Sequence, residues 1–196
     1  MGGNMNRIRY EQELKEIILS NNWFMEVLRI VRECNPPNWF VGGGVIRNIV
    51  WDKLHGYNEP TALKDIDVAI YDISDLSAER DKQIQEKLKK HLPRENWEVT
   101  NQAAVHLWYE RCFGYRVAPL ESCEDAISTW PETATCIGVR VMKDDSLVIV
   151  APYGLDDLFN LILRRNQKRI TQEIFLNRLK EKRICDKWPK VTVIYE

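Results

Sequence analysis

The chain has 196 residues, of which 44% are hydrophobic and 29% charged, and its formal net charge is −1 with a sequence pI of about 6.3. These values are ordinary for a soluble globular domain, and they exclude a strongly basic surface that would attract nucleic acid as a whole. Five scattered cysteines without a Cys-x-x-Cys pair, no run of transmembrane length and a polar start argue against a structural zinc site, a membrane span and a signal peptide, so we expect a cytoplasmic protein.

Apolar periodicity and chain breakers predict the elements of the first half of the sequence. In chain order they are helices over 11–19 and 23–34, a strand over 39–41, a helix from 44 to about 53, a strand over 64–71, a helix over 77–92 and a strand over 97–100. Residues 101–109 mix polar and aromatic side chains and fit a helix or an extended segment equally well.

The second half is predicted to contain further helices and a β-hairpin. The elements are a helix from 122 to 130, hairpin strands over 135–141 and 147–151, amphipathic helices over 155–165 and 171–183, and a last strand over 191–195. Because the strands are grouped rather than strictly alternating with helices, we expect an α+β fold. We expect one domain over 1–196, with N-terminal helices in 1–35 and a core with C-terminal helices in 36–196.

Two acidic residues stand out in the strand predicted over 64–71. Residues two apart on a strand share a face, so Asp65 and Asp67 are expected to project side by side. Such carboxylates repel each other unless a cation lies between them, and hard oxygen ligands select Mg²⁺ or Mn²⁺. An Asp-x-Asp pair taken alone is more often a pair of solvated residues or helix caps.

Three consecutive glycines, Gly42, Gly43 and Gly44, precede these acids and lie between an apolar strand and an apolar helix. Glycine lets the backbone approach a ligand closely, and the amides at a helix start favour phosphate. A glycine run alone usually marks a turn or a linker. The order of glycine turn, helix and Asp-x-Asp strand favours a site for a metal-bound nucleoside triphosphate.

Residues 43–48 (Gly-Gly-Val-Ile-Arg-Asn) and 65–67 (Asp-Ile-Asp) together resemble the signature of the polymerase β nucleotidyltransferase superfamily. Residues 101–109, 130–135 and 151–159 are similar to a narrower group in it, the bacterial nucleotidyltransferase-like proteins. The resemblance runs from about residue 23 to the C-terminus and implies a small mixed sheet flanked by helices. Asn48 departs from the usual Asp of the signature, and the stretch between Arg47 and Asp65 is longer than in compact members.

The resemblance implies that two Mg²⁺ ions bridge Asp65, Asp67 and the triphosphate of an NTP. A third carboxylate normally comes from a neighbouring strand, and Glu98 is the best-placed candidate. Glu110 and Glu121 are fallbacks, and a solvent-facing strand residue is the alternative for Glu98. It further implies phosphate contacts from Gly42, Gly43, Gly44 and Arg47. The alternative for Arg47 is a surface salt bridge, for example to Asp52.

Three residues after the third predicted strand are further candidates for nucleotide binding. Asn101 and Gln102 could read the base or sugar, and His106 could contact a phosphate or ribose. A histidine near Leu and Trp is more often a hydrogen-bonded core residue. Elsewhere, Asp156 and Asp157 fit a helix N-terminus. A basic cluster (Arg164, Arg165, Lys168 and Arg169) fits either a surface face or a contact for RNA.

Three functions follow from these residues. The first is a metal-dependent nucleotidyltransferase that moves a nucleotide from an NTP to a hydroxyl of an RNA, a protein or a small molecule. The second is a catalytically inactive nucleotide or metal sensor of the same fold. It is motivated by the lack of an assured third carboxylate and by the departure from the signature at Asn48. The third is a protein-interaction module that uses an aromatic-rich surface (Trp97, Trp108, Tyr109, Phe113 and Tyr115). The sequence specifies neither the acceptor nor the oligomeric state.

Overall fold

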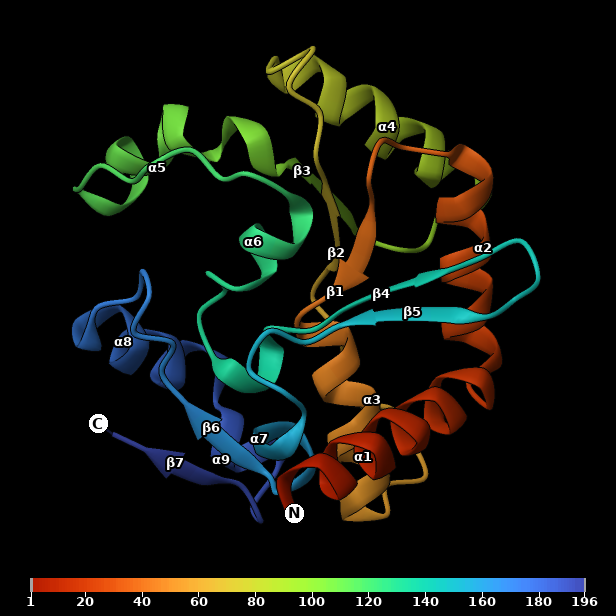
Figure 1. Ribbon diagram of the computed structural model, residues 1–196, viewed down its shortest axis with the longest axis vertical. Coiled ribbons are helices and arrows are strands. Elements are labelled where there is room, and N and C mark those ends of the chain that lie inside the picture. The colour runs from red at the N-terminus through yellow and green to blue at the C-terminus, as the bar shows by residue number, and fades with distance from the viewer. Residues whose placement is uncertain (1, 196) are drawn as a thin grey trace.

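A five-stranded sheet and a two-stranded sheet organise the chain in the computed structural model, which describes residues 2–195 (Figure 1). The strands are β1 (Phe40–Gly42), β2 (Ile66–Ile70), β3 (Trp97–Asn101), β4 (Gly138–Val141), β5 (Leu147–Val150), β6 (Ile162–Arg164) and β7 (Thr192–Ile194). The helices are α1 (Gly2–Leu19), α2 (Asn22–Cys34), α3 (Gly44–His55), α4 (Ala78–His91), α5 (Val105–Phe113), α6 (Cys123–Ile127), α7 (Asp156–Phe159), α8 (Gln172–Lys182) and α9 (Ile184–Lys187). Two 3₁₀ turns complete the described elements, η1 (Gln102–Ala104) and η2 (Thr133–Thr135).

The larger sheet is mixed, with the strand order β3-β2-β1-β4-β5. Strand β1 is antiparallel to both β2 and β4, and β4 and β5 form the predicted hairpin. Strands β2 and β3 are parallel, and α4 provides the crossover that a parallel pair requires. The mixed sheet with its flanking helices confirms the predicted α+β class.

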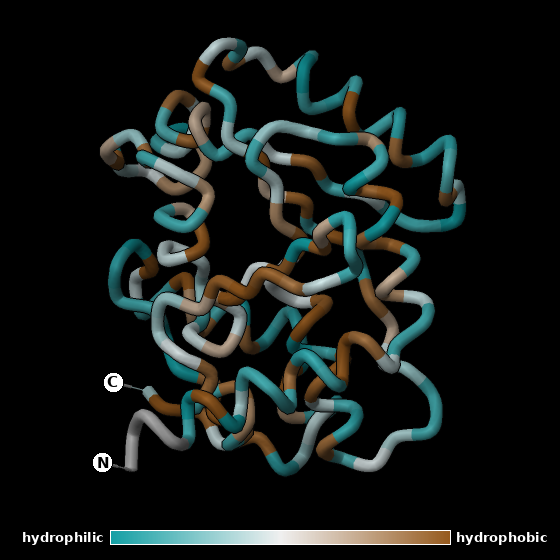
Figure 2. Tube along the Cα trace, turned by 45° about the vertical axis from the view of Figure 1, so that its right-hand side comes forward, coloured by the Kyte–Doolittle hydropathy of each residue, from teal (hydrophilic) through white to brown (hydrophobic). Residues whose placement is uncertain are grey.

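Alternation along the strands separates two faces of this sheet. Val41, Val68 and Val139 belong to the main core, to which helices α1 to α4 contribute most of their buried residues. Phe40 and Ala69 point to the opposite face and pack in a smaller cluster with residues of α6. Figure 2 shows the hydrophobic residues gathered along the central strands, while the outer turns of the helices are mostly hydrophilic. The second face is therefore only partly covered by packing, and this leaves room for a site.

Local sequence signals explain where several helices begin. The side chains of Asn21, Ser77, Ser122 and Thr171 each accept a hydrogen bond from a backbone N–H in the first turn of α2, α4, α6 and α8. Such caps satisfy N–H groups that have no partner within the helix. The segment left open between helix and extended chain folds as η1 followed by α5.

The helix predicted over 155–165 is wrong. Only the four residues of α7 are helical there, and β6 follows at Ile162. Leu161 has a φ of 56°, a left-handed conformation that breaks a right-handed helix, and its carbonyl accepts a hydrogen bond from the N–H of Thr192. Parallel pairing of β6 with β7, a contact distant in sequence, replaces the local helical bonds.

The predicted N-terminal helices are present, and α1 extends further toward the N-terminus than expected. Tyr10 of α1 stacks on Phe159 with ring centroids 4.7 Å apart, and its hydroxyl donates to Asn160 Oδ1. These contacts attach α1 to α7. Within residues 2–195, no helix combines the length and the hydrophobicity that crossing a bilayer requires.

Replacing Gly42 by Ala should destabilise the protein by about 3 kcal/mol, because the added Cβ would overpack the sheet. It would lie 2.2 Å from the Ile137 carbonyl oxygen and 2.8 Å from the Trp130 ring. Gly44→Ala is the matched control, since its Cβ would meet only Arg47 Nη2, at 3.8 Å. Urea denaturation of both variants measures the difference. Equal loss of stability in the two would contradict this packing role for Gly42.

Candidate metal and nucleotide site

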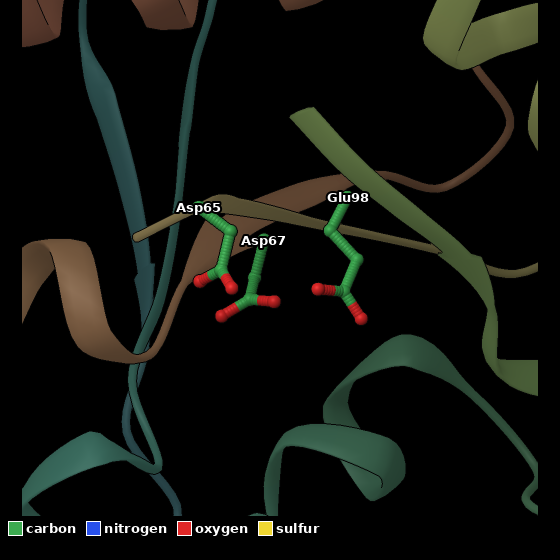
Figure 3. A group of neighbouring side chains, drawn as sticks. All are labelled: Asp65, Asp67 and Glu98. Atoms are coloured by element: carbon green, nitrogen blue, oxygen red, sulfur yellow. The ribbon is translucent and has the colours of Figure 1, made fainter. Parts of the chain in front are cut away.

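Three carboxylates converge at the start of the parallel strand pair. Asp67 of β2 is in register with Glu98 of β3, and Asp65 lies two residues before Asp67 and so on the same face. One carboxylate oxygen from each of the three lies within 4.8 Å of the others. Figure 3 shows the three side chains extending from the strands toward a common space. The predicted third carboxylate, Glu98, therefore joins the predicted pair.

The cluster is electrostatically unfavourable without a cation. Burial, followed by the negative charges of Asp65 and Glu98, raises the pKa of Asp67 to about 6, although Lys182 and Arg178 oppose this shift. Glu98 is exposed and the two aspartates are half-buried. A set of only carboxylate oxygens at this spacing suits a hard divalent ion such as Mg²⁺ or Mn²⁺. The residues thus fit the cofactor expected from the sequence.

The glycine turn lies directly beside the acids. Gly42 is the register partner of Asp67, and a Cβ placed on Gly43 would lie 3.5 Å from Asp67 Oδ2. Gly43 has a φ of 69°, which glycine adopts without strain, and α3 begins at Gly44. The N-terminus of α3 therefore opens next to the carboxylates. Gly42 itself is buried against Ile137 and Trp130.

A cavity of about 440 Å³ extends from the carboxylates over the less covered face of the sheet. Gly43, Gly44, the three acids, and residues of α5 and α8 line it. Figure 1 shows α5 and α8, the two helices that contribute these lining residues, on the left of the sheet. A larger cavity of about 810 Å³ lies between α3, the loop that follows it and the junction of α1 and α2, but none of the three carboxylates lines it. The chemistry therefore assigns the smaller cavity as the candidate site.

Arg47 lines the cavity but is not a free surface arginine. Its Nε and Nη2 donate to Asn48 Oδ1 at 3.2 and 2.7 Å, and its guanidinium lies 5.0 Å from the ring centroid of Trp188. Burial lowers its pKa to about 10. Asp52, the alternative partner, accepts hydrogen bonds from Thr61 and Trp188 instead. Arg47 is thus held at the wall of the cavity by packing.

The three candidates after β3 occupy different positions. Gln102 lines the cavity. Asn101 is buried and its side chain bonds backbone groups, among them the N–H of Ala103 and the carbonyl of Asp72, so it joins η1 to the end of β2. His106 is half-buried outside the cavity lining, and its Nδ1 is buried without a hydrogen-bond partner among the described residues.

Several other charged candidates have partners of their own. Glu110 pairs with Arg116 on the surface, and neither Glu110 nor Glu121 lines the cavity. Asp157, in the first turn of α7, pairs with Arg164. Lys168 pairs with Asp125, whereas Arg169 from the same basic cluster lines the cavity.

Three further residues at this site were not identified from the sequence: Glu132, Arg178 and Lys182. Arg178 Nε donates to Glu132 Oε1 at 2.8 Å, and both residues line the cavity with Lys182. Burial acts to raise the pKa of Glu132, but Arg178 holds it below its ordinary value. The pKa of Lys182 is lowered by burial and then by Arg178. The sequence signal for two of them was the spacing of Arg178 and Lys182, which are four residues apart and therefore on one face of the helix predicted over 171–183.

Comparison with known proteins agrees with this geometry. A family model described as nucleotidyltransferase matches residues 29–193. The chain belongs to this nucleotidyltransferase family. Among solved structures, it is similar to a protein whose NMR structure reveals a CCA-adding enzyme head domain, with 27% identity and a TM-score of 0.78. That match covers 93% of this chain and 95% of the other.

More distant matches show the same fold in longer proteins. The Thermotoga maritima CCA-adding enzyme complexed with tRNA has 13% identity and a TM-score of 0.54, and the match covers 92% of this chain and 42% of that one. A tRNA-processing enzyme has 14% identity, a TM-score of 0.52, and coverage of 86% and 43%. The chain thus spans less than half the length of these two enzymes. Among curated proteins, none matches the sequence.

The raised pKa of Asp67 predicts how stability depends on pH. The folded protein holds a proton at Asp67 more tightly than the unfolded chain does, so without metal its stability should fall as pH rises from about 4 to about 6. Asp67→Asn should remove this loss and stabilise the metal-free protein at pH 7 by about 2 kcal/mol. Denaturation of both proteins between pH 4 and 8 measures the effect.

Mn²⁺ provides the control for this measurement, because a bound cation should relieve the same repulsion. Adding Mn²⁺ at pH 7 should raise the melting temperature of the wild type more than that of the variant. Parallel curves of stability against pH for the two proteins would contradict the attribution of this pH dependence to Asp67.

Proposed function

We propose that the protein is a divalent-cation-dependent nucleotidyltransferase that moves a nucleotide from an NTP to a hydroxyl group of an acceptor. The observation that carries this proposal is the convergence of Asp65, Asp67 and Glu98 beside the glycine turn. A carboxylate cluster provides a place for a cation, and a helix N-terminus preceded by glycine provides a place for phosphate. The two lie in one cavity.

Asp65, Asp67 and Glu98 would hold Mg²⁺ or Mn²⁺ in this reaction. A divalent cation held there would act as a Lewis acid on the α-phosphate and would lower the pKa of the attacking hydroxyl. The turn at Gly43 and Gly44 would receive the phosphates against the N-terminus of α3, with no Cβ at Gly43 to block close approach to Asp67. Arg47, at the wall of the cavity, adds positive charge to the same end.

Arg178 and Lys182 on α8 would bind the β- and γ-phosphates. Arg178 is already oriented by its ion pair with Glu132, whereas Lys182 makes no ion pair with any described residue. Lys182 lines the same cavity as the three carboxylates, and its positive charge acts to lower the pKa of Asp67. Fixed cations at this position stabilise the charge that develops on the departing pyrophosphate.

The names of the similar structures suggest one class of acceptor to test. Two of them are described as tRNA-processing or tRNA-bound enzymes, but they are more than twice as long as the matched region. RNA is therefore one acceptor class to test, beside a protein or a small molecule. The cytoplasmic location expected from the sequence stays a prediction.

Substitution of the aspartates tests the reaction. Asp65→Asn and Asp67→Asn should each lower Mg²⁺-dependent incorporation of labelled NTP into acceptors from a cell extract by more than about 100-fold, because each removes a charge from the cation site. EDTA should abolish the wild-type signal. Asp144→Asn, in the exposed β4–β5 turn, is the control and should retain activity.

Equal labelling by wild type and the two variants would remove the carboxylates from the mechanism. Two measurements distinguish the enzyme from the alternative sensor: an assay of pyrophosphate release and calorimetry of NTP binding. Binding that is tight and Mg²⁺-dependent, yet never followed by pyrophosphate release, would favour the sensor.

Lys182→Ala should raise the KM for NTP by about 10- to 100-fold, because it removes one charge-assisted contact to phosphate. Lys180→Ala is the matched control, since this lysine is exposed on the same helix and does not line the cavity. Steady-state kinetics at varied NTP measures the difference between the two variants. A KM unchanged in Lys182→Ala would show that the phosphates lie elsewhere.

A further inference from the structure

An aromatic surface forms the end of the cavity that faces α5. Trp108, Tyr109, Phe113 and Arg169 line it, and we refer to these four residues as the aromatic shelf. The ring centroids of Tyr109 and Phe113 are 4.4 Å apart, and those of Trp108 and Tyr109 are 6.3 Å apart with a stacked orientation. The guanidinium of Arg169 lies 5.6 Å from the Tyr109 ring centroid.

Tyr109 anchors the shelf, while its neighbours remain accessible. The Tyr109 side chain is buried, and its hydroxyl is within hydrogen-bond distance of the Tyr115 hydroxyl, at 3.1 Å. Burial and this hydrogen bond raise its pKa, so it stays a neutral phenol. Trp108 is half-buried, and Phe113 is 40% exposed. Aromatic faces that line a cavity beside a candidate catalytic site are suited to stacking with a flat ring.

The two ends of the cavity differ in chemistry, and this difference orients the reaction. The glycine turn, Arg178 and Lys182 supply the groups that suit a triphosphate. Glu98 lies at the other side of the acid cluster, on β3, which continues through η1 into α5 and the shelf. In a phosphoryl-type transfer, the attacking oxygen and the leaving pyrophosphate are roughly in line on opposite sides of phosphorus. A triphosphate bound at the glycine turn, Arg178 and Lys182 would leave the side of the acid cluster that faces the shelf for the attacking hydroxyl.

We infer that the aromatic shelf is the acceptor subsite and that it takes the base of a ribonucleoside, whose ribose hydroxyl attacks the NTP. This inference rests on the proposed function. The base would stack on Trp108, and Arg169 would face its sugar-phosphate. The acceptor oxygen forms a bond to the α-phosphorus while the bond from that phosphorus to the bridging oxygen breaks. Pyrophosphate leaves, and the hydroxyl proton passes to solvent.

A free nucleotide and the 3′ end of an RNA share this chemistry, so both serve as probes. Calorimetry with the four ribonucleoside 5′-monophosphates and with a short single-stranded RNA would be done on protein saturated with Mg²⁺ and an α,β-methylene NTP analogue. At least one probe should bind the wild type. Trp108→Ala should weaken that binding by about 5- to 150-fold, the range that stacking of one base accounts for, and Trp108→Phe should restore most of it.

Leu107→Ala is the matched control. Leu107 precedes Trp108 on α5, is 62% exposed and does not line the cavity, so this substitution should leave probe binding unchanged. Affinity for the NTP analogue should also be unchanged in Trp108→Ala. Ribose 5-phosphate, which lacks the base, should bind equally weakly to wild type and variant. Thermal melting of each variant verifies that it is folded.

Three outcomes would overturn the inference: binding of no probe to the wild type, equal probe binding by wild type and Trp108→Ala, or weakened binding of the NTP analogue in that variant. The last outcome would place the base of the NTP on the shelf. Failure of the proposed function is seen separately, as an absence of Mg²⁺-dependent binding of the analogue to the wild type. Preference for monophosphate or RNA among the probes that bind identifies the source of the nucleoside.

Discussion

The repulsion among three carboxylates at the start of β2 and β3 is the constraint on which the site depends. Parallel pairing sets Asp67 opposite Glu98, and Asp65, which directly precedes β2, brings a carboxylate oxygen within 4.8 Å of one from each of them. Both placements are electrostatically unfavourable in the metal-free protein, since burial and like charge raise the pKa of Asp67 to about 6. The buried core beneath the sheet opposes this cost, because Val68 and Val99 anchor the same strands from the other face. A fold that holds carboxylates together at such a cost suits a functional site in which a bound cation offsets their repulsion.

Much of this arrangement could be predicted because its signals are local. The strand with Asp65 and Asp67, the glycine turn and the strand with Glu98 each occupy a few consecutive residues, and a strand period of two assigns their faces. The cap residues Asn21 and Ser77 likewise act on N–H groups three residues away. The α+β class followed from the grouping of strands, and the family resemblance implied the small mixed sheet flanked by helices.

Features that depend on distant contacts were not predictable in this way. The helix expected over 155–165 fails because β6 pairs with β7 about thirty residues later, and periodicity does not reveal that partner. The environment of Arg47 is set by Trp188, which arrives from the end of the chain. Arg178 and Lys182 read as an ordinary basic face of an amphipathic helix until the fold brings α8 to the cavity. Sequence patterns identified the carboxylates and the glycine turn, whereas only tertiary packing shows that Arg178 and Lys182 line the same cavity.

The replacement of Asp by Asn at position 48 has a physical consequence at one of these walls. An aspartate there would neutralise Arg47, but the amide oxygen of Asn48 accepts two hydrogen bonds and leaves the charge of the guanidinium intact. Glu132 is the buried carboxylate that acts on Arg47, Arg178 and Lys182 together, and its ion pair is with Arg178. Arg47, Arg178 and Lys182 thus bring one positive charge more to the cavity wall than Glu132 and Glu181 balance. A polyanion such as triphosphate would supply the missing negative charge, so the departure at Asn48 is consistent with a phosphate-binding site.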